Sequence, residues 1–365
     1  MFKTRLRRLI ALQSAQGLDC VALMPGPNLR YLTGLTMHTS ERPTLALFPL
    51  QSPPALILPL LEAQGLAEDL RSEVRLFPYT DEEGPQGAFE AAATALELAG
   101  KRIGVEFLQM RVLELRRLEQ VAPGCHILAF EAFLQELRAC KDDSELEQMR
   151  RAIRITEDAL FTVIAQVHPG QTEEEIATEL RMAMLRAGAE EVAFIIAVAG
   201  PRTASPHVSP SSRPLEQGDV LIVDCGAVCG GYVADITRTF AVGEIPAKLE
   251  RVYAVVRAAN EAGRAAVRPG VAAQEVDRAA RRVISEAGYG EYFIHRTGHG
   301  LGLEVHEPPY IVEGNDTILQ PGMTFTVEPG IYVPGLGGVR IEDDVVVTAT
   351  GAETLTTYSR ELIHL

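Results

Sequence analysis

The sequence lacks tryptophan, holds only five cysteines in 365 residues, and contains no apolar run near the roughly 20 residues that a transmembrane helix needs. The apolar stretch at residues 9–12 is interrupted by Gln13 and Ser14, so it is too short for an export signal. The cysteines are odd in number and sparse, which indicates a reducing compartment rather than a disulfide scaffold. We therefore expect a cytoplasmic protein.

Positive charge is also scarce, with 34 Lys and Arg residues against 49 Asp and Glu residues and a formal net charge of -15. Nucleic acids and anionic membranes are bound by clustered basic residues, so neither is expected as a partner. Hydrophobic residues make up 47% of the chain and charged residues 23%, and no low-complexity block is present, which indicates a folded globular protein. The length suits two domains.

In residues 1–133, short apolar runs alternate with helix-like segments, which predicts a small α/β domain. The expected strands are residues 21–24, 44–50, 55–58, 74–77, 103–106 and 126–129. A linker is predicted at residues 134–143, followed by a second domain over residues 144–365. The first helix of that domain is expected to begin at Ser144, whose side chain would form a capping box with that of Glu147.

A weak repeat with an offset of 100 residues runs through the second domain. Each copy has a Pro-Gly break, an amphipathic helix and a glycine stop. The matching residues are Val167, Pro169, Gly170, Glu175, Ile176 and Gly188 in the first copy, and Val267, Pro269, Gly270, Glu275, Val276 and Gly288 in the second. Either the match is chance, because helix ends commonly carry glycine, or the domain has two similar halves related by a pseudo-twofold axis.

Two carboxylates flank a glycine-rich turn in the segment GDVLIVDCGAVCGGYVADITRTF. If the turn is Cys229-Gly230-Gly231, Asp224 and Asp235 face each other across two apolar strands, with Cβ atoms about 4.5 to 5.5 Å apart. Two buried carboxylates at that separation repel each other unless they share a proton or a cation.

A second acidic pair occurs in the segment TFTVEPGIYVPGLGGVRIEDDVVV, where Glu328 and Glu342 are symmetric about Gly335. Either pair alone has an ordinary explanation, because acidic residues often stand at exposed strand ends. Two such pairs on apolar strands favour a cation site.

Three of the chain's eight histidines, His295, His299 and His306, fall in HRTGHGLGLEVHE, between the two pairs. A lone core histidine usually satisfies hydrogen bonds, whereas three beside four carboxylates indicate one metal ligand plus catalytic or substrate-binding groups. Four carboxylates and one imidazole form an oxygen-rich set that suits Mn²⁺, Co²⁺ or a pair of Zn²⁺ ions. Bridging carboxylates would hold two ions about 3.5 to 4 Å apart.

The segments VDCGA, ADITRT, GHGLG, VEPGIY and GVRIED resemble, in order, spacing and flanking glycines, those of the pita-bread metallopeptidases, a family that includes prolidase, aminopeptidase P and methionine aminopeptidase. The resemblance implies an α/β (α+β) fold, with a creatinase-type domain followed by a pita-bread domain of two pseudo-twofold halves. It also implies two divalent metal ions per chain, one held by Asp224 and the other by His299 and Glu328. Asp235 and Glu342 would bridge them.

Further positions resemble the proline-specific branch of this family. His207 and His306 match histidines that contact the substrate carbonyl and the tetrahedral intermediate, although on the residues alone His207 could be an ordinary loop histidine. His295, Tyr332 and Arg340 match residues that shape the proline subsite or support the metal ligands.

The N-terminal segment PGPNLRYLTG resembles the creatinase-type domain, which simple methionine aminopeptidases lack. In that family the domain helps to form a homodimer and reaches toward the partner's active site. The resemblance therefore makes His38 and Arg42 candidate substrate contacts.

Taken together, the resemblance implies hydrolysis of the peptide bond between an N-terminal residue and proline by a metal-bridging hydroxide, with Glu328 as proton shuttle. The sequence leaves open whether the substrate is a dipeptide, as for prolidase, or a longer peptide, as for aminopeptidase P. Two alternatives are a non-catalytic binding module on the same fold and a metal-free C–N hydrolase of the creatinase type. The five filled ligand positions favour the metallopeptidase.

Overall fold

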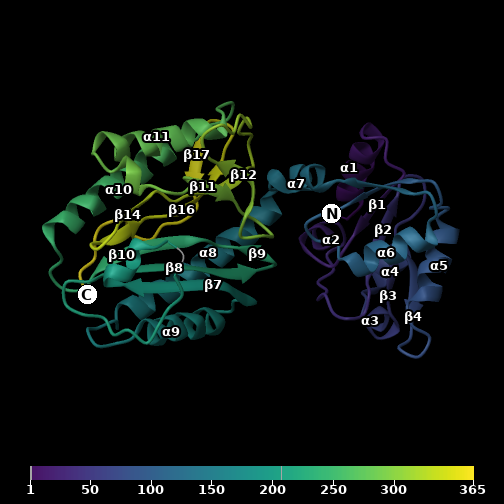
Figure 1. The fold of residues 1–365 in the computed structure, drawn as a ribbon, viewed down its shortest axis with the longest axis horizontal. Coiled ribbons are helices and arrows are strands. Elements are labelled where there is room, and N and C mark those ends of the chain that lie inside the picture. Colours follow the sequence, from purple (N-terminus) through teal and green to yellow (C-terminus); the bar gives the residue numbers. More distant parts are fainter. Residues whose placement is uncertain (1, 207) are drawn as a thin grey trace. The chain divides into compact units, whose positions relative to one another are not determined.

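A computed structural model describes residues 2–206 and 208–365, and the chain divides into unit 1, Met1–Arg138, and unit 2, Ala139–Leu365 (Figure 1). The stretch predicted as a linker, residues 134–143, contains the end of helix α7 (Glu131–Ala139) and the first residue of helix α8 (Asp143–Ile164). Within the described ranges, no helix is long and apolar enough to cross a membrane.

Unit 1 is built on a six-stranded mixed sheet whose strand order is β4-β3-β2-β1-β5-β6. All six predicted runs form strands: β1 (Cys20–Leu23), β2 (Leu45–Pro49), β3 (Ala55–Pro59), β4 (Arg75–Tyr79), β5 (Arg102–Val105) and β6 (His126–Ala129). Strand β1 is buried along its whole length, which explains its unbroken apolar sequence. The helices besides α7 are α1 (Phe2–Ala15), α2 (Pro27–Thr33), α3 (Leu60–Gln64), α4 (Glu68–Glu73), α5 (Gln86–Ala95) and α6 (Val112–Val121).

Unit 2 combines helices with a sheet of order β10-β8-β7, to which β9 adds, a sheet of order β12-β11-β13-β16-β17, and the pair β14-β15. Its helices after α8 are α9 (Glu173–Arg186), α10 (Ala247–Ala266) and α11 (Ala273–Glu286), with short 3₁₀ helices η1 (Gly200–Ala204) and η2 (Gly290–Tyr292). Its strands are β7 (Glu191–Ala199), β8 (Val220–Cys229), β9 (Tyr232–Val233), β10 (Ile236–Ala241), β11 (Gly298–Gly300), β12 (Glu307–Ile311), β13 (Thr324–Val327), β14 (Gly330–Val333), β15 (Gly337–Arg340), β16 (Asp343–Val347) and β17 (Ala352–Thr354).

The repeat seen in the sequence is structural. Helices α9 and α11 begin and end at positions 100 residues apart. The N–H of Gly170 donates to the carbonyl of Leu215 at 2.8 Å, and the N–H of Gly270 donates to the carbonyl of Leu319 at 2.9 Å. Figure 1 shows α9 and α11 on opposite sides of the strands, as two similar halves require.

The core of unit 2 follows from the apolar faces of these helices. Met149, Ile153 and Leu160 lie on one face of α8 and are buried in a cluster with Leu180 of α9 and Val223 of β8. The strands that carry the acidic residues are thus held between packed helices.

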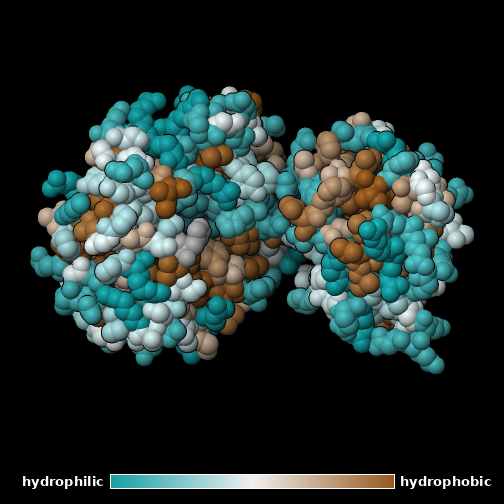
Figure 2. Space-filling model, in the orientation of Figure 1, coloured by the Kyte–Doolittle hydropathy of each residue, from teal (hydrophilic) through white to brown (hydrophobic). Residues whose placement is uncertain are grey.

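On the face of the molecule in Figure 2, hydrophilic residues cover most of both units and hydrophobic residues form separate patches.

The start of α8 differs from the prediction. The N-cap is Asp142, not Ser144, and the capping box joins Asp142 to Glu145 rather than to Glu147. The N–H of Glu145 donates to Oδ1 of Asp142 at 3.0 Å, and the N–H of Asp142 donates to Oε2 of Glu145 at 2.8 Å. Both Asp and Ser cap helices well, so the sequence offered two starts two residues apart.

Replacing Asp142 by alanine is therefore expected to lower the free energy of unfolding by about 1 kcal/mol, because an N–H of the first turn loses its acceptor. Ser144→Ala should cost less, since its hydroxyl donates to Asp142 and caps no backbone group. Urea unfolding of both variants measures the difference. A larger loss for Ser144→Ala would contradict the assigned cap.

Candidate functional site

The first acidic pair does not have the predicted register. The turn is Gly230-Gly231, with φ angles of 58° and 82°, so Cys229 pairs with Tyr232. This pairing places Thr237, not Asp235, opposite Asp224. The prediction that the two aspartates face each other directly was wrong because the turn was placed one residue too early. Asp235 instead lies in the break between β9 and β10, where its N–H donates to Oδ2 of Asp344 at 3.1 Å.

The second acidic pair has the predicted register. Val327 of β13 pairs with Asp343 of β16, and Gly330 of β14 pairs with Arg340 of β15. Both pairings share the symmetry about Gly335, so Glu328 and Glu342 lie across from each other in the break between the two ladders. The chain there is freed from strand pairing while the flanking strands hold it in place.

His299 lies in the middle of β11, between two glycines that the strand packing requires. A Cβ at Gly298 would lie 1.8 Å from the carbonyl oxygen of Thr326, and a Cβ at Gly300 would lie 2.4 Å from that of Pro308. The glycines therefore allow neighbouring backbone to approach closely on both sides of the imidazole.

These side chains converge in unit 2. Nε2 of His299 lies 3.3 Å from Oε1 of Glu328 and 3.7 Å from Oδ2 of Asp235. Asp235, His299 and Glu342, all buried, each place one potential ligand atom within 4.8 Å of the others. Oε2 of Glu342 also accepts a hydrogen bond from the hydroxyl of Thr237 at 2.5 Å.

Burial and crowding change the acidity of these carboxyl groups. Burial raises the pKa of Asp235 well above its ordinary value, and the charges of Glu342 and Asp224 raise it further. Burial likewise raises the pKa of Glu342, with Glu328 and Asp224 adding to the effect. For Glu328, burial acts in the same direction but is outweighed by His299, His295 and Arg340, so its pKa falls to about 2. Without a counter-cation, the cluster holds more negative charge than it can stabilise.

Two acceptor atoms in the cluster point to a metal rather than to internal hydrogen bonds. Nδ1 of His299 lies 3.1 Å from the carbonyl oxygen of Gly300, which can only accept, so Nδ1 carries the proton. With a metal ion bound, the ring would be neutral and the lone pair of Nε2 would face the ion, beside the oxygens of Glu328 and Asp235. Oδ1 of Asp224 is also buried, and no described residue donates a hydrogen bond to it. Carboxylate oxygens and imidazole nitrogens that receive no hydrogen bond are suitable ligands for a divalent cation.

Arg340 ties the cluster to a second group of side chains. Its Nη2 donates to Oδ2 of Asp224 at 2.5 Å and its Nη1 donates to the hydroxyl of Tyr332 at 2.9 Å. The Tyr332 hydroxyl donates in turn to Nε2 of His295 at 2.9 Å, since Nδ1 of His295 is engaged with the Arg296 carbonyl. Burial raises the pKa of Tyr332 to about 12, so the phenol keeps this proton.

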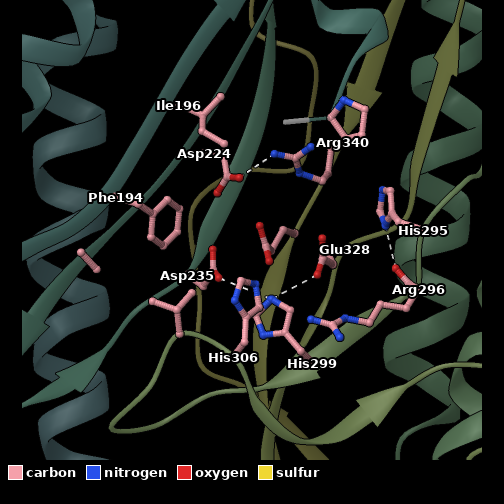
Figure 3. Close-up of a pocket in the computed structure, with 14 residues that line it drawn as sticks. Phe194, Ile196, Asp224, Asp235, His295, Arg296, His299, His306, Glu328 and Arg340 are labelled. Carbon is pink, nitrogen blue, oxygen red and sulfur yellow. Dashed lines mark hydrogen bonds and ion pairs between the residues drawn. The ribbon is translucent and has the colours of Figure 1, made fainter. Parts of the chain in front are cut away.

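A cavity of about 690 Å³ opens onto the cluster, and Figure 3 shows the side chains around it. His306 lies at its exposed edge, with its ring 4.2 Å from that of His299. The lining residues are Ala193, Phe194, Ile196, Pro206, Asp224, Asp235, His295, Arg296, His299, Val305, His306, Glu328, Arg340 and Glu342. The cavity thus combines an apolar wall with the acidic cluster, as ligand-binding sites commonly do.

The other predicted site residues lie elsewhere. His207 falls outside the described residues. His38 and Arg42 belong to unit 1, where His38 is exposed. Nε and Nη2 of Arg42 donate to the two carboxylate oxygens of Asp81, each at 2.7 Å.

Six residues that line the cavity were not predicted from the sequence: Ala193, Phe194, Ile196, Pro206, Arg296 and Val305. Phe194 and Ile196 lie on β7, where an unbroken apolar run gave no sign of which side chains face the cavity. Arg296 also lines the cavity, although it directly follows His295 in the sequence. A basic residue inside a histidine-rich segment was the one available signal for it.

Comparison with known proteins gives consistent matches over the whole chain. A model of metallopeptidase family M24 matches residues 147–349, and a model of the Creatinase/Prolidase N-terminal domain matches residues 5–140. The probable dipeptidase PepE of Mycobacterium tuberculosis is 39% identical over 367 residues, which cover 100% of this chain and 96% of the relative. The Xaa-Pro dipeptidase of Pyrococcus horikoshii is 33% identical over 370 residues, with 98% of each chain covered.

Among solved structures, the prolidase from Thermococcus sibiricus superposes with a TM-score of 0.95 at 36% sequence identity. The match covers 100% of this chain and 99% of that one.

Proposed function

Since the chain belongs to metallopeptidase family M24, we propose that it hydrolyses the peptide bond between an N-terminal residue and proline. The observation that carries the proposal is the buried cluster of carboxylates around His299, whose Nε2 faces oxygens of Glu328 and Asp235. The relatives named Xaa-Pro dipeptidase and prolidase, which match essentially the full chain, support the proline specificity.

Membership of the family implies a divalent metal cofactor, and we assign two ions to this cluster. Asp224 would hold one ion, His299 and Glu328 the other, while Asp235 and Glu342 would bridge them. The oxygen-rich set suits Mn²⁺, Co²⁺ or Zn²⁺. The chemistry supplied by the bound ions is Lewis-acid polarisation of the scissile carbonyl and activation of water.

The remaining steps belong to side chains of the chain. Glu328, whose pKa is lowered to about 2, stays ionised at neutral pH and can accept a proton from the attacking water. His306, at the edge of the cavity, can donate a hydrogen bond to the oxygen on which negative charge develops. His207 is assigned the same task.

Arg340, Tyr332 and His295 position the site. The guanidinium of Arg340 holds one oxygen of Asp224, which leaves the other oxygen for an ion. Tyr332 fixes both Arg340 and the ring of His295, which lines the cavity. The amide before proline is tertiary and has no N–H, so a pocket that selects by shape suits this bond.

The cellular setting and assembly are also proposals. A cytoplasmic location is supported by the five cysteines, all within the described residues, which form no disulfide. We further propose that the protein forms a homodimer in which His38 and Arg42 contact the substrate of the partner subunit. The family resemblance supports this role.

Hydrolysis of Ala-Pro by the purified protein tests the proposal. We expect turnover to be lost when a chelator removes divalent ions and to return with Mn²⁺, and Ala-Ala to be cleaved more slowly than Ala-Pro. Activity that survives chelation would instead indicate a metal-free C–N hydrolase. Failure to cleave Ala-Pro with Mn²⁺ present would contradict the proline specificity.

A further inference from the structure

A buried ion pair lies one residue from His306 and has no assigned task. Nζ of Lys141 lies 2.6 Å from Oε1 of Glu307, and the two side chains are 1% and 2% exposed. His306, which directly precedes Glu307, is exposed at the edge of the cavity. The attraction within a buried ion pair often does no more than offset the cost of removing both charges from water. A role beyond stability is therefore expected for this pair.

Lys141 projects from a fixed stretch of backbone at the beginning of unit 2. Its N–H donates to the carbonyl of Gly322 at 2.8 Å, and Cys140 forms a bridge with Met323. The next residue, Asp142, is the N-cap of α8. The ammonium group thus has an anchored base on both sides of its residue.

The strand that begins at Glu307 is held less regularly. His299 of β11 pairs with Tyr310 of β12. The next residue, Gly300, pairs with Glu307, so the register shifts and the two prolines at 308 and 309 lie in between. Proline has no N–H to donate to a ladder. The ion pair supplies a further restraint at this irregular end of β12, directly after His306.

The ion pair also lies against the loop that carries His306. A Cβ at Gly302 would lie 2.7 Å from Oε1 of Glu307 and 2.8 Å from Cε of Lys141. The loop therefore contacts the ion pair at Gly302 and ends at it with Glu307. Between these two points it brings Val305 and His306 to the wall of the cavity.

Resting on the proposed function, we propose that Lys141 and Glu307 are positioning residues, which hold His306 where its imidazole can donate to the oxyanion. An oxyanion donor is effective when it lies about 2.7 to 3.1 Å from the charged oxygen. A misplacement of about 1 Å can lower the rate about 100-fold. Because the negative charge develops only in the transition state, the ion pair should affect kcat rather than KM.

The test measures kcat and KM for Ala-Pro, and Mn²⁺ content, in Glu307→Gln, in His306→Ala and in the variant that combines both. We expect Glu307→Gln to lower kcat by about 10- to 100-fold, with KM within about twofold of the wild type and Mn²⁺ content unchanged. Since the pair acts through His306, adding Glu307→Gln to His306→Ala should lower kcat no further.

Two further variants separate positioning from a loss of stability. Leu180→Ala removes a fully buried side chain of α9, so it should destabilise the protein and leave kcat unchanged. Lys141→Met/Glu307→Met replaces the pair by apolar side chains of similar volume, a kind of change that is often neutral for stability. This variant decides the question if Glu307→Gln does not fold. Methionine is flexible and forms no ion pair, so kcat should still fall about tenfold or more.

Four results would overturn the inference. They are wild-type kcat in Lys141→Met/Glu307→Met, independent losses from Glu307→Gln and His306→Ala, an equal fall in kcat in Leu180→Ala, and a loss of Mn²⁺ in Glu307→Gln, which would assign the pair to His299. Each of them leaves metal-dependent cleavage of Ala-Pro by the wild type intact. If the wild type with Mn²⁺ does not cleave Ala-Pro, the proposed function itself fails and the inference fails with it.

Discussion

Glu342→Ala is expected to lower kcat/KM for Ala-Pro by about 10³-fold or more. The variant removes a carboxylate that would bridge both ions, and metal polarisation of the carbonyl contributes several kcal/mol, where each 1.36 kcal/mol is about a tenfold change in rate. Asp235→Ala should have the same effect, because the two residues supply ligand atoms to one cluster with His299. Steady-state kinetics with saturating Mn²⁺ measures both variants.

The matched control for these variants is Glu313→Ala. Glu313 is exposed and pairs with the exposed Arg278, and such surface ion pairs contribute about 0 to 1 kcal/mol. This variant should keep the wild-type rate. Wild-type turnover in Glu342→Ala or Asp235→Ala would refute the assignment of those residues as bridging ligands.

The second large effect is on the stability of the folded protein, and it concerns Asp343, the residue that follows Glu342. Asp343 is fully buried and accepts hydrogen bonds from Arg238, Arg360 and Thr356 at 2.7 to 2.9 Å. Asp343→Asn should lower the free energy of unfolding by about 3 to 5 kcal/mol, because it leaves the buried guanidinium charge of Arg238 uncompensated. In metal-free protein at pH 8, Glu342→Gln should instead raise the free energy of unfolding, since it removes one of several carboxylates that repel one another.

Urea unfolding in the presence of a chelator measures both variants, and pH gives a further check. Burial opposes ionisation of Asp343, but Arg238 and Arg360 outweigh it and lower the pKa from 3.8 to about 2. A lowered folded-state pKa stabilises the protein above the unfolded value, so the contribution is full above about pH 4 and is lost toward pH 2. The difference between wild type and Asp343→Asn should shrink over that range. Equal stability of the two proteins at pH 7 would contradict this role.

Much of the fold could be predicted because local patterns decide it. The six strands of unit 1 follow apolar runs, and the 100-residue repeat follows glycines at helix ends. The family resemblance is confirmed by the matches to metallopeptidase family M24 and to the Creatinase/Prolidase N-terminal domain. The α/β fold class, with its N-terminal domain and pita-bread domain, is confirmed with it.

The details that failed depend on choices that sequence symmetry leaves open. A hairpin of Cys229, Gly230 and Gly231 admits more than one turn, and a shift of the turn by one residue moves the partner of Asp224 from Asp235 to Thr237. The register of Glu328 and Glu342 was predicted correctly, because the two strand pairings on either side of them are both symmetric about Gly335. At the start of α8, Asp142 and Ser144 are both residue types that cap helices well, and the folded structure uses Asp142.

The ion pair of Lys141 and Glu307 escaped prediction for a different reason. Its proposed importance rests on the burial of two side chains 166 positions apart and on the place of one of them beside His306. Neither the pairing nor the burial is visible in a local pattern. Residues that work by position are the hardest to read from a single sequence.

The metal content of the purified protein tests the central claim most directly. After equilibration with Mn²⁺ and removal of unbound ions, elemental analysis of the wild type should find two ions per chain, and Glu342→Ala and Asp235→Ala should each retain fewer. The Glu313→Ala control should match the wild type. A wild type that binds no ion, or bridging-residue variants that keep the full complement, would contradict the account.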